Sequence, residues 1–347
     1  MNAEKNSASL SRGFEMTAPS CSDEEFIQLW SRLKSGAKVA QELGVSSRSA
    51  LARRRRLESA YGIALNSAVF DNSKSPTDMR AARLNELAEI RQRKYHKDMH
   101  KTLTDGVVIV ASDCHYWPQV VTVAHQAFCT LAKKLQPKMI VLNGDILDGA
   151  RISRHARIMW EKQPELKDEI GAVQDRCAEI ERAGNGATLV RTIGNHDARF
   201  ENYLSGRVGE FEEMTGMTLL DYLPRWEAGW ALHLNANTDG WTTIRHRPVS
   251  GGVHSAYNST LRAGVHYVHG HLHKLQVTPW ADYRGRRYGV DTGTMADPYG
   301  PQFNYTEAGP VNWASGFAVL TFHNGRLLEP EVCVVQNGEA WFRGQKV

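Results

Sequence analysis

The sequence predicts a mixed α/β protein, a layered β-sandwich flanked by helices, with a small all-α domain ahead of it. After Thr104, short apolar runs typical of buried strands alternate with helical segments, and the later strands follow one another with few helices between them. That order is typical of packed layers whose second half is mainly β. Before Thr104, the apolar residues recur at helical spacing only.

The composition restricts the class of protein. The chain has 347 residues, of which 41% are hydrophobic and 23% charged, a balance that suits two globular domains and excludes disordered, collagen-like and coiled-coil chains. The longest apolar run, residues 107–111, is far shorter than the roughly 20 residues of a membrane span, and the N-terminus has no apolar signal core. The five cysteines are scattered without a CxxC pair, which indicates neither a disulfide framework nor a thiolate zinc site. We therefore expect a cytoplasmic protein without membrane association.

Four segments are expected along the chain. Residues 1–22 are rich in Ser, Ala, Asn and Thr without periodicity and are predicted to be a disordered leader. Residues 23–62 are predicted to form the helical domain. Residues 63–104 are predicted to be a linker followed by a spacer helix over 78–98. Residues 105–347 are predicted to form the α/β domain.

Three short helices are predicted in the first domain. Apolar residues from Phe26 to Leu33 recur at i, i+3, i+4 and i+7, the spacing of one buried helical stripe. A second helix is expected to end at Gly44, because glycine readily adopts the left-handed conformation found at helix ends. Ser46 or Ser47 is suited to cap the third helix through its side-chain oxygen.

The segment AKVAQELGVSSRSALARRRRLE, residues 37–58, resembles a helix-turn-helix nucleic-acid-binding module. Small Ala40 lets the helices approach, and Val45 is expected to fill the core between them. The front of the chain is also its basic part, since residues 1–104 hold 18 Lys and Arg against 12 Asp and Glu. The alternative is a helical cap with solvated arginines. The residues expected to contact nucleic acid are Arg48, Arg53, Arg54, Arg55 and Arg56.

In the α/β domain, polar motifs follow the predicted strands. Strands are expected over 107–113, 139–145, 187–195, 241–249, 264–271, 286–293, 316–323 and 327–336, and helices over 120–136 and 164–184. The motifs DCH, GD, GNHD, a lone His and GHLH stand at the ends of five of these strands, where α/β folds collect their ligands. Asp, His and Asn are suitable ligands for two metal ions, which together clamp the oxygens of a displacement at phosphorus. Gly144, Gly194 and Gly270 are expected to make sharp turns that aim the next side chain at the site.

In that order, DCH, GDILD, GNHD, the lone His and GHLH resemble the calcineurin-like metallophosphoesterase family over about residues 105–300. The resemblance implies the family's β-sandwich and two divalent metal ions, with manganese favoured and iron, zinc or nickel as alternatives. It implies that one ion is held by Asp113, His115, Asp145 and His273. The second would be held by Asp145, Asn195, His246 and His271, so that Asp145 bridges the two.

The resemblance also implies the acid of the reaction. His196 would lie over the phosphate and protonate the leaving alkoxide, oriented by Asp148, with Asp197 as the rival partner. His246 ends the run WTTIRH, as a ligand at a strand end should, but it lacks the Gly that many relatives place after it. His254 therefore stays as the alternative ligand.

Departures from the family pattern bear on the substrate. Protein phosphatases of the family typically carry Arg after the orienting carboxylate and Glu after the acid, whereas this chain has Gly149 and Asp197. The pattern resembles the nuclease and phosphodiesterase branch, although Arg151 or Arg154 is able to replace the phosphate contact. A binding module ahead of such a centre resembles bacteriophage and prophage proteins and concentrates a polymer substrate.

We therefore expect a dinuclear metal-dependent phosphodiesterase acting on nucleic acid, with a DNA nuclease as the leading case. The alternatives are a phosphomonoesterase acting on phosphoproteins or nucleotides, and a DNA-binding regulator in which the phosphoesterase domain is a scaffold. Trp117 and Trp160 are candidates for base stacking, with core packing as the ordinary role of such residues.

Overall fold

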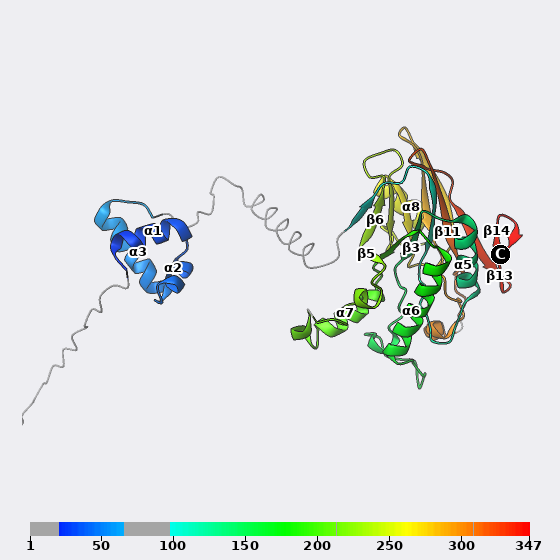
Figure 1. Cartoon of the computed structure of the whole chain (residues 1–347), viewed down its shortest axis with the longest axis horizontal. Helices are drawn as coiled ribbons and strands as arrows, with labels where there is room; N and C mark the ends of the chain where they lie inside the picture. Colours follow the sequence, from blue (N-terminus) through cyan, green and yellow to red (C-terminus); the bar gives the residue numbers. More distant parts are fainter. Residues whose placement is uncertain (1–20, 66–97, 213, 308) are drawn as a thin grey trace, which may run out of the picture. The chain divides into compact units, whose positions relative to one another are not determined.

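The computed structural model describes residues 21–65 and 98–347, except residues 213 and 308. The chain divides into two compact units, drawn in Figure 1. Of the predicted leader, only Cys21 and Ser22 are among the described residues. The predicted spacer helix over 78–98 lies outside them except for Asp98.

The first unit consists of three helices. They are α1 (Asp23–Leu33), α2 (Gly36–Glu42) and α3 (Ser47–Tyr61). Ser22 caps α1: its Oγ accepts the N–H of Glu25 at 3.1 Å, and the Glu25 carboxylate accepts the N–H of Ser22 at 2.7 Å. Ser46 caps α3 by accepting the N–H of Ser49 at 3.1 Å. Buried apolar side chains from all three helices form the core: Phe26, Trp30, Val39, Ala40, Ala50 and Leu57.

Val45 does not belong to that core. Its side chain is 38% exposed, so the prediction that it fills the space between the helices is wrong. Gly44 has φ +62° and turns the chain at the end of α2, as expected. The space is filled from α1 instead, where Phe26 and Trp30 are fully buried.

The second unit is a sandwich of two sheets. The larger has the order β15-β14-β13-β11-β2-β3-β4-β5, with β12 paired to β11. β2, β3, β4 and β5 are parallel, whereas β11 pairs with β2 in the antiparallel direction. The bounds are β2 (Gly106–Ala111), β3 (Met139–Asn143), β4 (Thr188–Thr192), β5 (Glu227–Gly229), β11 (Gly316–His323), β12 (Arg326–Leu327), β13 (Glu331–Gln336), β14 (Glu339–Phe342) and β15 (Gln345–Lys346).

The smaller sheet has the order β1-β6-β7-β8-β10-β9. Its strands are β1 (Met99–Lys101), β6 (Ala231–Leu234), β7 (Thr242–Arg245), β8 (His266–His269), β9 (Gln276–Asp282) and β10 (Gly285–Asp291). Buried aliphatic side chains fill the space between the sheets; among them are Val108, Val110, Val141, Leu232, Val268, Val290 and Leu320. The two sheets therefore share one core.

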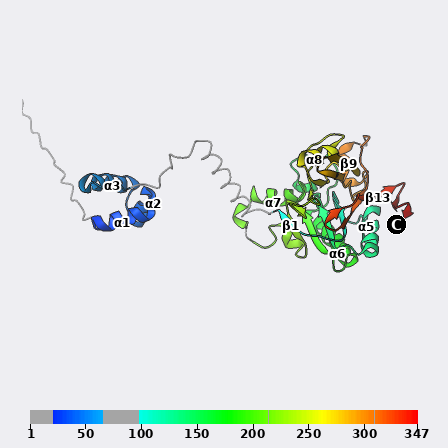
Figure 2. The same cartoon turned by 90° about the horizontal axis from the view of Figure 1, so that it is seen from above.

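Helices cover the outer faces of the sandwich. In Figure 2, α5 (Val123–Leu135) and α6 (Leu166–Ala183) lie on the side of the larger sheet, and α8 (Ser255–Ala263) lies across the smaller one. α7 (Asp197–Ser205) follows β4. Short 3-10 helices are η1 (Ala150–Ile152), η2 (Gly209–Phe211), η3 (Leu219–Tyr222) and η4 (Pro301–Thr306). No helix in the described part of the chain is both long and apolar enough to cross a bilayer.

The predicted α/β sandwich is confirmed, and the strands that were predicted differ from the observed ones mainly at their ends. The run predicted over 327–336 is interrupted at Pro330, which has no N–H to donate, and β13 begins at Glu331. α5 begins at Val123 because Thr122 caps it, accepting the N–H of His125 at 3.2 Å. The prediction missed β1, β5, β6, β9, β14 and β15.

Candidate metal centre

The polar motifs lie at the carboxyl ends of strands from both sheets. β2 leads to Asp113 and His115, β3 to Asp145, and β4 to Asn195 and His196. β7 leads to His246, and β8 leads to His271 and His273. The three parallel strands of the larger sheet and two strands of the smaller one thus supply one site.

Two clusters of ligand atoms form there. The first is Asp113, His115 and His273, and the second is Asp145, His246 and His271; within each, the ligand atoms lie within 4.8 Å of one another. Nε2 of His273 is 3.0 Å from Oδ1 of Asp113, and Nε2 of His246 is 3.0 Å from Oδ2 of Asp145. The clusters adjoin, because Nε2 of His246 is also 4.0 Å from Oδ1 of Asp113.

Unpaired atoms in these clusters are suited to metal ions. His115 Nε2 and Asn195 Oδ1 are buried without a hydrogen-bond partner among the described residues, whereas Nε2 of His246 faces the carboxylate of Asp145 at 3.0 Å. The other ring nitrogen of each histidine is engaged: Nδ1 of His115 lies 3.0 Å from Asp148, and Nδ1 of His246 donates to the carbonyl of Asn143 at 2.8 Å. Metal-binding histidines are commonly oriented in this way, with the free nitrogen facing the ion. The nitrogen and oxygen atoms of this centre therefore fit divalent cations.

The charges agree with a cation site. Burial opposes ionisation of Asp113 and Asp145, but nearby histidines outweigh it: His273 and His246 lower the pKa of Asp113, and His246 lowers the pKa of Asp145. Burial also lowers the pKa of His246, yet the carboxylates of Asp145 and Asp113 outweigh it and raise that pKa to about 10. Both carboxylates are therefore ionised at neutral pH.

Five of these residues have a left-handed backbone. Their φ angles are positive: Asp113 52°, His115 39°, Asp145 53°, His271 72° and His273 59°. Side chains other than glycine rarely adopt this conformation, which costs on the order of 1 kcal/mol or more per residue. The side chains of these candidate ligands are therefore held in the site by backbone conformations that are energetically unfavourable on their own.

The three glycines act in two ways. Gly144 has φ +80° and makes the expected turn, and a Cβ there would lie 2.6 Å from the ring of His246. Gly194 and Gly270 have no positive φ, so a left-handed backbone is not what requires glycine at these two positions. They allow close approach instead: a Cβ at Gly194 would collide with Asp145, and one at Gly270 with Asp113.

Asp148, not Asp197, lies against His196. Oδ1 of Asp148 is 3.2 Å from Nδ1 of His196 and 3.0 Å from Nδ1 of His115. The carboxylate of Asp197 accepts the backbone N–H groups of Asp145 at 2.9 Å and of Gly194 at 2.9 Å. Asp197 therefore fixes two strand-end turns to each other.

Two polar residues near the centre were not predicted. Arg199, on α7, places Nη2 at 3.0 Å from Nε2 of His196 and donates from Nη1 to the carbonyl of Asp148 at 2.9 Å. In the sequence, the only indication of this contact was that Arg199 comes three residues after His196, a spacing that places two side chains on the same side of a helix. Glu169, on α6, is fully buried and accepts the N–H of Gly149 at 2.6 Å. Burial raises the pKa of Glu169 to about 7.

Aromatic rings line the other side of the first cluster. The ring of Phe303 lies 5.2 Å from that of His115 and 5.4 Å from that of His273, measured between centroids. Trp313 lies edge-on to His273 at 4.7 Å. These rings restrict the access of water to the ligands, and their positions more than 185 residues after Asp113 gave no sequence signal.

The remaining candidates have different surroundings. His254 is exposed at the start of α8, outside both clusters. Trp117 lines a cavity of about 490 Å³ together with Asp148, His196 and Tyr305. Trp160 is 88% exposed, and Arg151 is paired with Glu165 at 2.6 Å.

In the first unit, the arginines of α3 divide into two groups. Nη2 of Arg53 lies 2.7 Å from the Asp23 carboxylate and 2.7 Å from the carbonyl of Cys21. Arg54 pairs with Glu58 at 3.0 Å, and Arg56 contacts Asp23 at 3.0 Å while its side chain stays 62% exposed. Arg53 therefore joins α3 to the segment at the start of α1. Arg48 and Arg55 form the other group: they are exposed on α3 and have no ion pair among the described residues.

Comparison with known proteins gives consistent matches. The model of the family described as calcineurin-like phosphoesterase matches residues 106–292. The Gene 54 proteins of Mycobacterium phages L5 and D29 are each 26% identical over 230 residues, which is 58% of this chain and 84% of theirs. Among solved structures, Vps29 of Entamoeba histolytica, complexed with zinc, has a TM-score of 0.38 and 14% identity, covering 70% of this chain and 98% of its own. Vps29 of Chaetomium thermophilum has a TM-score of 0.37 and 10% identity, with 70% and 95% covered.

Proposed function

The chain belongs to the calcineurin-like phosphoesterase family, and on that basis we propose that it is a dinuclear metal-dependent phosphodiesterase that hydrolyses nucleic acid, DNA in the first place. The observation that supports this most strongly is the pair of adjoining clusters, Asp113–His115–His273 and Asp145–His246–His271. They lie beside His196, whose backbone N–H donates to Asp145 at 2.7 Å. We propose manganese as the ion, since the centre has no thiolate.

The chemistry follows from the residues around the two clusters. The two clusters would hold divalent ions, whose chemistry there would be activation of a water molecule and neutralisation of phosphate charge. His196 supplies the proton for the leaving oxygen. Burial lowers the pKa of His196, but the hydrogen bond that its ring donates to Asp148 and the charge of Asp145 outweigh burial and raise the pKa above the ordinary value. The raised pKa favours the protonated form of His196, which a general acid requires.

Three features favour a nucleic acid as substrate. Gly149 stands where the family's protein phosphatases carry an arginine. Trp117 and Tyr305 line the cavity beside His196 and offer flat faces to the base of a leaving nucleoside. Arg48 and Arg55 present free charge on α3, which suits contact with a phosphate backbone. We also propose that the enzyme acts in the reducing cytoplasm.

The test is a substrate panel with the full chain loaded with manganese. It contains single- and double-stranded DNA, RNA, a phosphopeptide, p-nitrophenyl phosphate and bis(p-nitrophenyl) phosphate. We expect cleavage of DNA and of the phosphodiester, and loss of both in His196→Ala. Hydrolysis of monoesters alone would replace the proposal with a phosphomonoesterase. DNA binding without hydrolysis of any substrate would favour the regulator with a scaffold domain.

A further inference from the structure

A second cavity, of about 660 Å³, adjoins the metal centre. Asn195 and Arg199 line both this cavity and the one that contains Trp117, whereas His196 lines only the latter. The two cavities therefore meet at Asn195, one of the proposed metal ligands. Only one of them contains the proton donor.

Among the residues that the structure describes, the second cavity is lined by five arginines and by no carboxylate. They are Arg154, Arg199, Arg207, Arg245 and Arg247. All but Arg199 are exposed, and none of these four has a carboxylate partner in the described part of the chain. Two exposed arginines elsewhere in this unit are paired, by contrast: Arg326 with Asp239 at 3.2 Å and Arg343 with Glu331 at 2.6 Å. We call the second cavity the arginine cavity. It concentrates positive charge that no carboxylate among the described residues balances.

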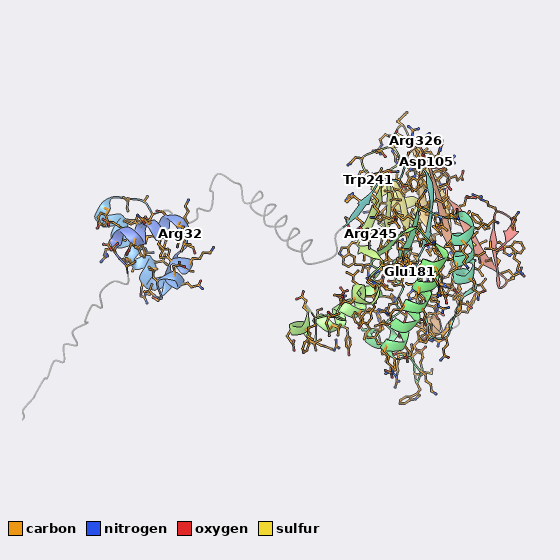
Figure 3. All side chains as sticks on the ribbon, in the orientation of Figure 1. Arg32, Asp105, Glu181, Trp241, Arg245 and Arg326 are labelled. Carbon is orange, nitrogen blue, oxygen red and sulfur yellow. The ribbon has the colours of Figure 1, made fainter. Side chains whose placement is uncertain are left out.

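The arginine cavity is assembled from segments far apart in the sequence. Arg154 follows η1, Arg207 follows α7, and Arg245, labelled in Figure 3, ends β7. Positive charges placed close together in a cavity repel one another, which is unfavourable unless an anion balances them. Their combined field also raises the local concentration of such an anion. Guanidinium groups bind phosphate with two parallel hydrogen bonds, so phosphate is the anion that they suit best.

Aromatic side chains accompany the arginines. Trp230 and Tyr203 line the same cavity, and the guanidinium of Arg207 lies 3.8 Å from the centroid of the Tyr203 ring. Faces of this kind stack on nucleobases without sequence preference. The volume of the cavity lies within the range of about 300–1,000 Å³ that is usual for small-molecule sites, which is enough for one nucleotide.

We infer that the arginine cavity binds the phosphate and base of the nucleotide next to the scissile linkage, so that the enzyme selects chains with at least two phosphates over an isolated phosphodiester. This inference rests on the proposed function. The leaving group lies in the cavity of Trp117, because His196 lines that cavity. The nucleotide in the arginine cavity is therefore the one on the retained side of the phosphodiester.

The experiment compares three thymidine dinucleotides with the full chain in manganese. They are TpT and its derivatives with a terminal phosphate at the 5′ or the 3′ end, and chromatography separates cleavage of the internal linkage from loss of the terminal phosphate. We expect one derivative to be cleaved with a kcat/KM at least tenfold above that of TpT. The identity of that derivative reports which side of the linkage is retained.

The double variant Arg154→Ala/Arg207→Ala should lose most of that preference, measured as a ratio within each protein. Both positions lie away from the proposed metal ligands in the sequence, and metal content is measured to check that the centre is intact. The matched control is Arg182→Ala, an exposed arginine on α6 outside the cavity, which should keep the wild-type ratio. A second readout is binding of a tetranucleotide to the His196→Ala protein. Its salt dependence should become weaker by about one unit of slope when both arginines are removed.

The outcomes separate the two proposals. If all three dinucleotides are cleaved equally, or if the double variant keeps the preference, the arginine cavity does not bind a flanking phosphate, while the nuclease proposal stands. If no internal linkage is cut and p-nitrophenyl phosphate is hydrolysed, the nuclease proposal itself fails. A selective loss of phosphopeptide hydrolysis in the double variant would assign the cavity to phosphoproteins and overturn the inference.

Discussion

Nη2 of Arg199 lies 3.0 Å from Nε2 of His196, the ring nitrogen that faces away from Asp148. The imidazole thus lies between a cation and an anion that act on its pKa in opposite directions. Burial lowers the pKa of His196, Asp148 and Asp145 raise it, and Arg199 lowers it. The position of this pKa depends on a balance that single substitutions can change in either direction.

Asp148→Asn and Arg199→Ala should move the basic limb of the pH–rate profile in opposite directions. Without the Asp148 charge, the pKa of His196 falls, and the acid loses its proton at a pH lower by about one unit. Without Arg199 the pKa rises, and activity persists to higher pH. The measurement is kcat/KM on bis(p-nitrophenyl) phosphate between pH 5 and 10. Shifts in the same direction would mean that Arg199 does not act through His196.

Asp145→Asn should remove both ions, because Asp145 is expected to bridge them. Asp113→Asn should remove one, since Asp113 belongs to the first cluster only. The metal content per chain, determined by mass spectrometry, measures this directly. Asp168→Asn, at an exposed carboxylate of α6, is the control and should keep both ions. Loss of a single ion from Asp145→Asn would exclude the bridge.

His246→Ala should deplete one ion, whereas His254→Ala should leave both in place. The reason is position: His246 is 1% exposed and contacts Asp145, while His254 is exposed at the start of α8. Metal analysis of the two variants decides between them. Depletion in His254→Ala would mean that the loop before α8 closes over the metals in solution.

Glu169→Gln should reduce the difference between the free energies of unfolding at pH 5 and at pH 8. The pKa of Glu169 rises from 4.5 to about 7 in the folded chain, so the folded state binds the proton more tightly than the unfolded state. Stability is therefore lost as pH rises from about 4.5 to about 7, by at most about 3 kcal/mol from this residue. Urea unfolding at pH 5 and pH 8 measures the difference. If the variant shows the same difference in unfolding free energy between pH 5 and pH 8 as the wild type, Glu169 does not contribute to the pH dependence of stability.

Arg48→Ala/Arg55→Ala should weaken binding to long DNA and reduce its salt dependence without unfolding the first unit. Both side chains are exposed and unpaired among the described residues, so their loss removes phosphate contacts only. Arg53→Ala should instead lower the melting temperature of that unit, because Arg53 joins α3 to Asp23. Cleavage of bis(p-nitrophenyl) phosphate is the control for the metal centre in each variant. Undiminished DNA binding by the double variant would mean that these arginines are only solvated surface.

The sequence predicted the strands that lead into the metal centre better than the strands at the edges of the sheets. β2 and β3 are covered on both faces and therefore form nearly continuous apolar runs, and β4 has a buried Leu-Val pair at its centre. β9 alternates partly buried and exposed residues, and β5 has only three residues, so neither shows a clear periodic signal. Short strands at the edges are specified by their partners more than by their own residues.

The ligands were predictable because each follows a strand end in a short motif. The residues that orient them were not. Glu169 binds the N–H of Gly149 from a helix 20 residues away, and Phe303 lies against His115 from the far end of the chain. Asp148 was predicted to orient His196 and lies against it, whereas Asp197, the rival partner, binds backbone N–H groups instead. Such roles depend on tertiary contacts, which carry no fixed spacing.

The left-handed backbone of Asp113, His115, Asp145, His271 and His273 has an evolutionary consequence. Glycine at any of these five positions would relieve an unfavourable conformation, and asparagine would tolerate it better, so the metal-free chain would become easier to fold. A lineage that no longer needed the reaction would gain stability by accepting such replacements. Decay of this centre would therefore begin with substitutions that make the protein more robust, and a thermostable homologue with glycines in DCH or GHLH would be the first place to look for lost catalysis.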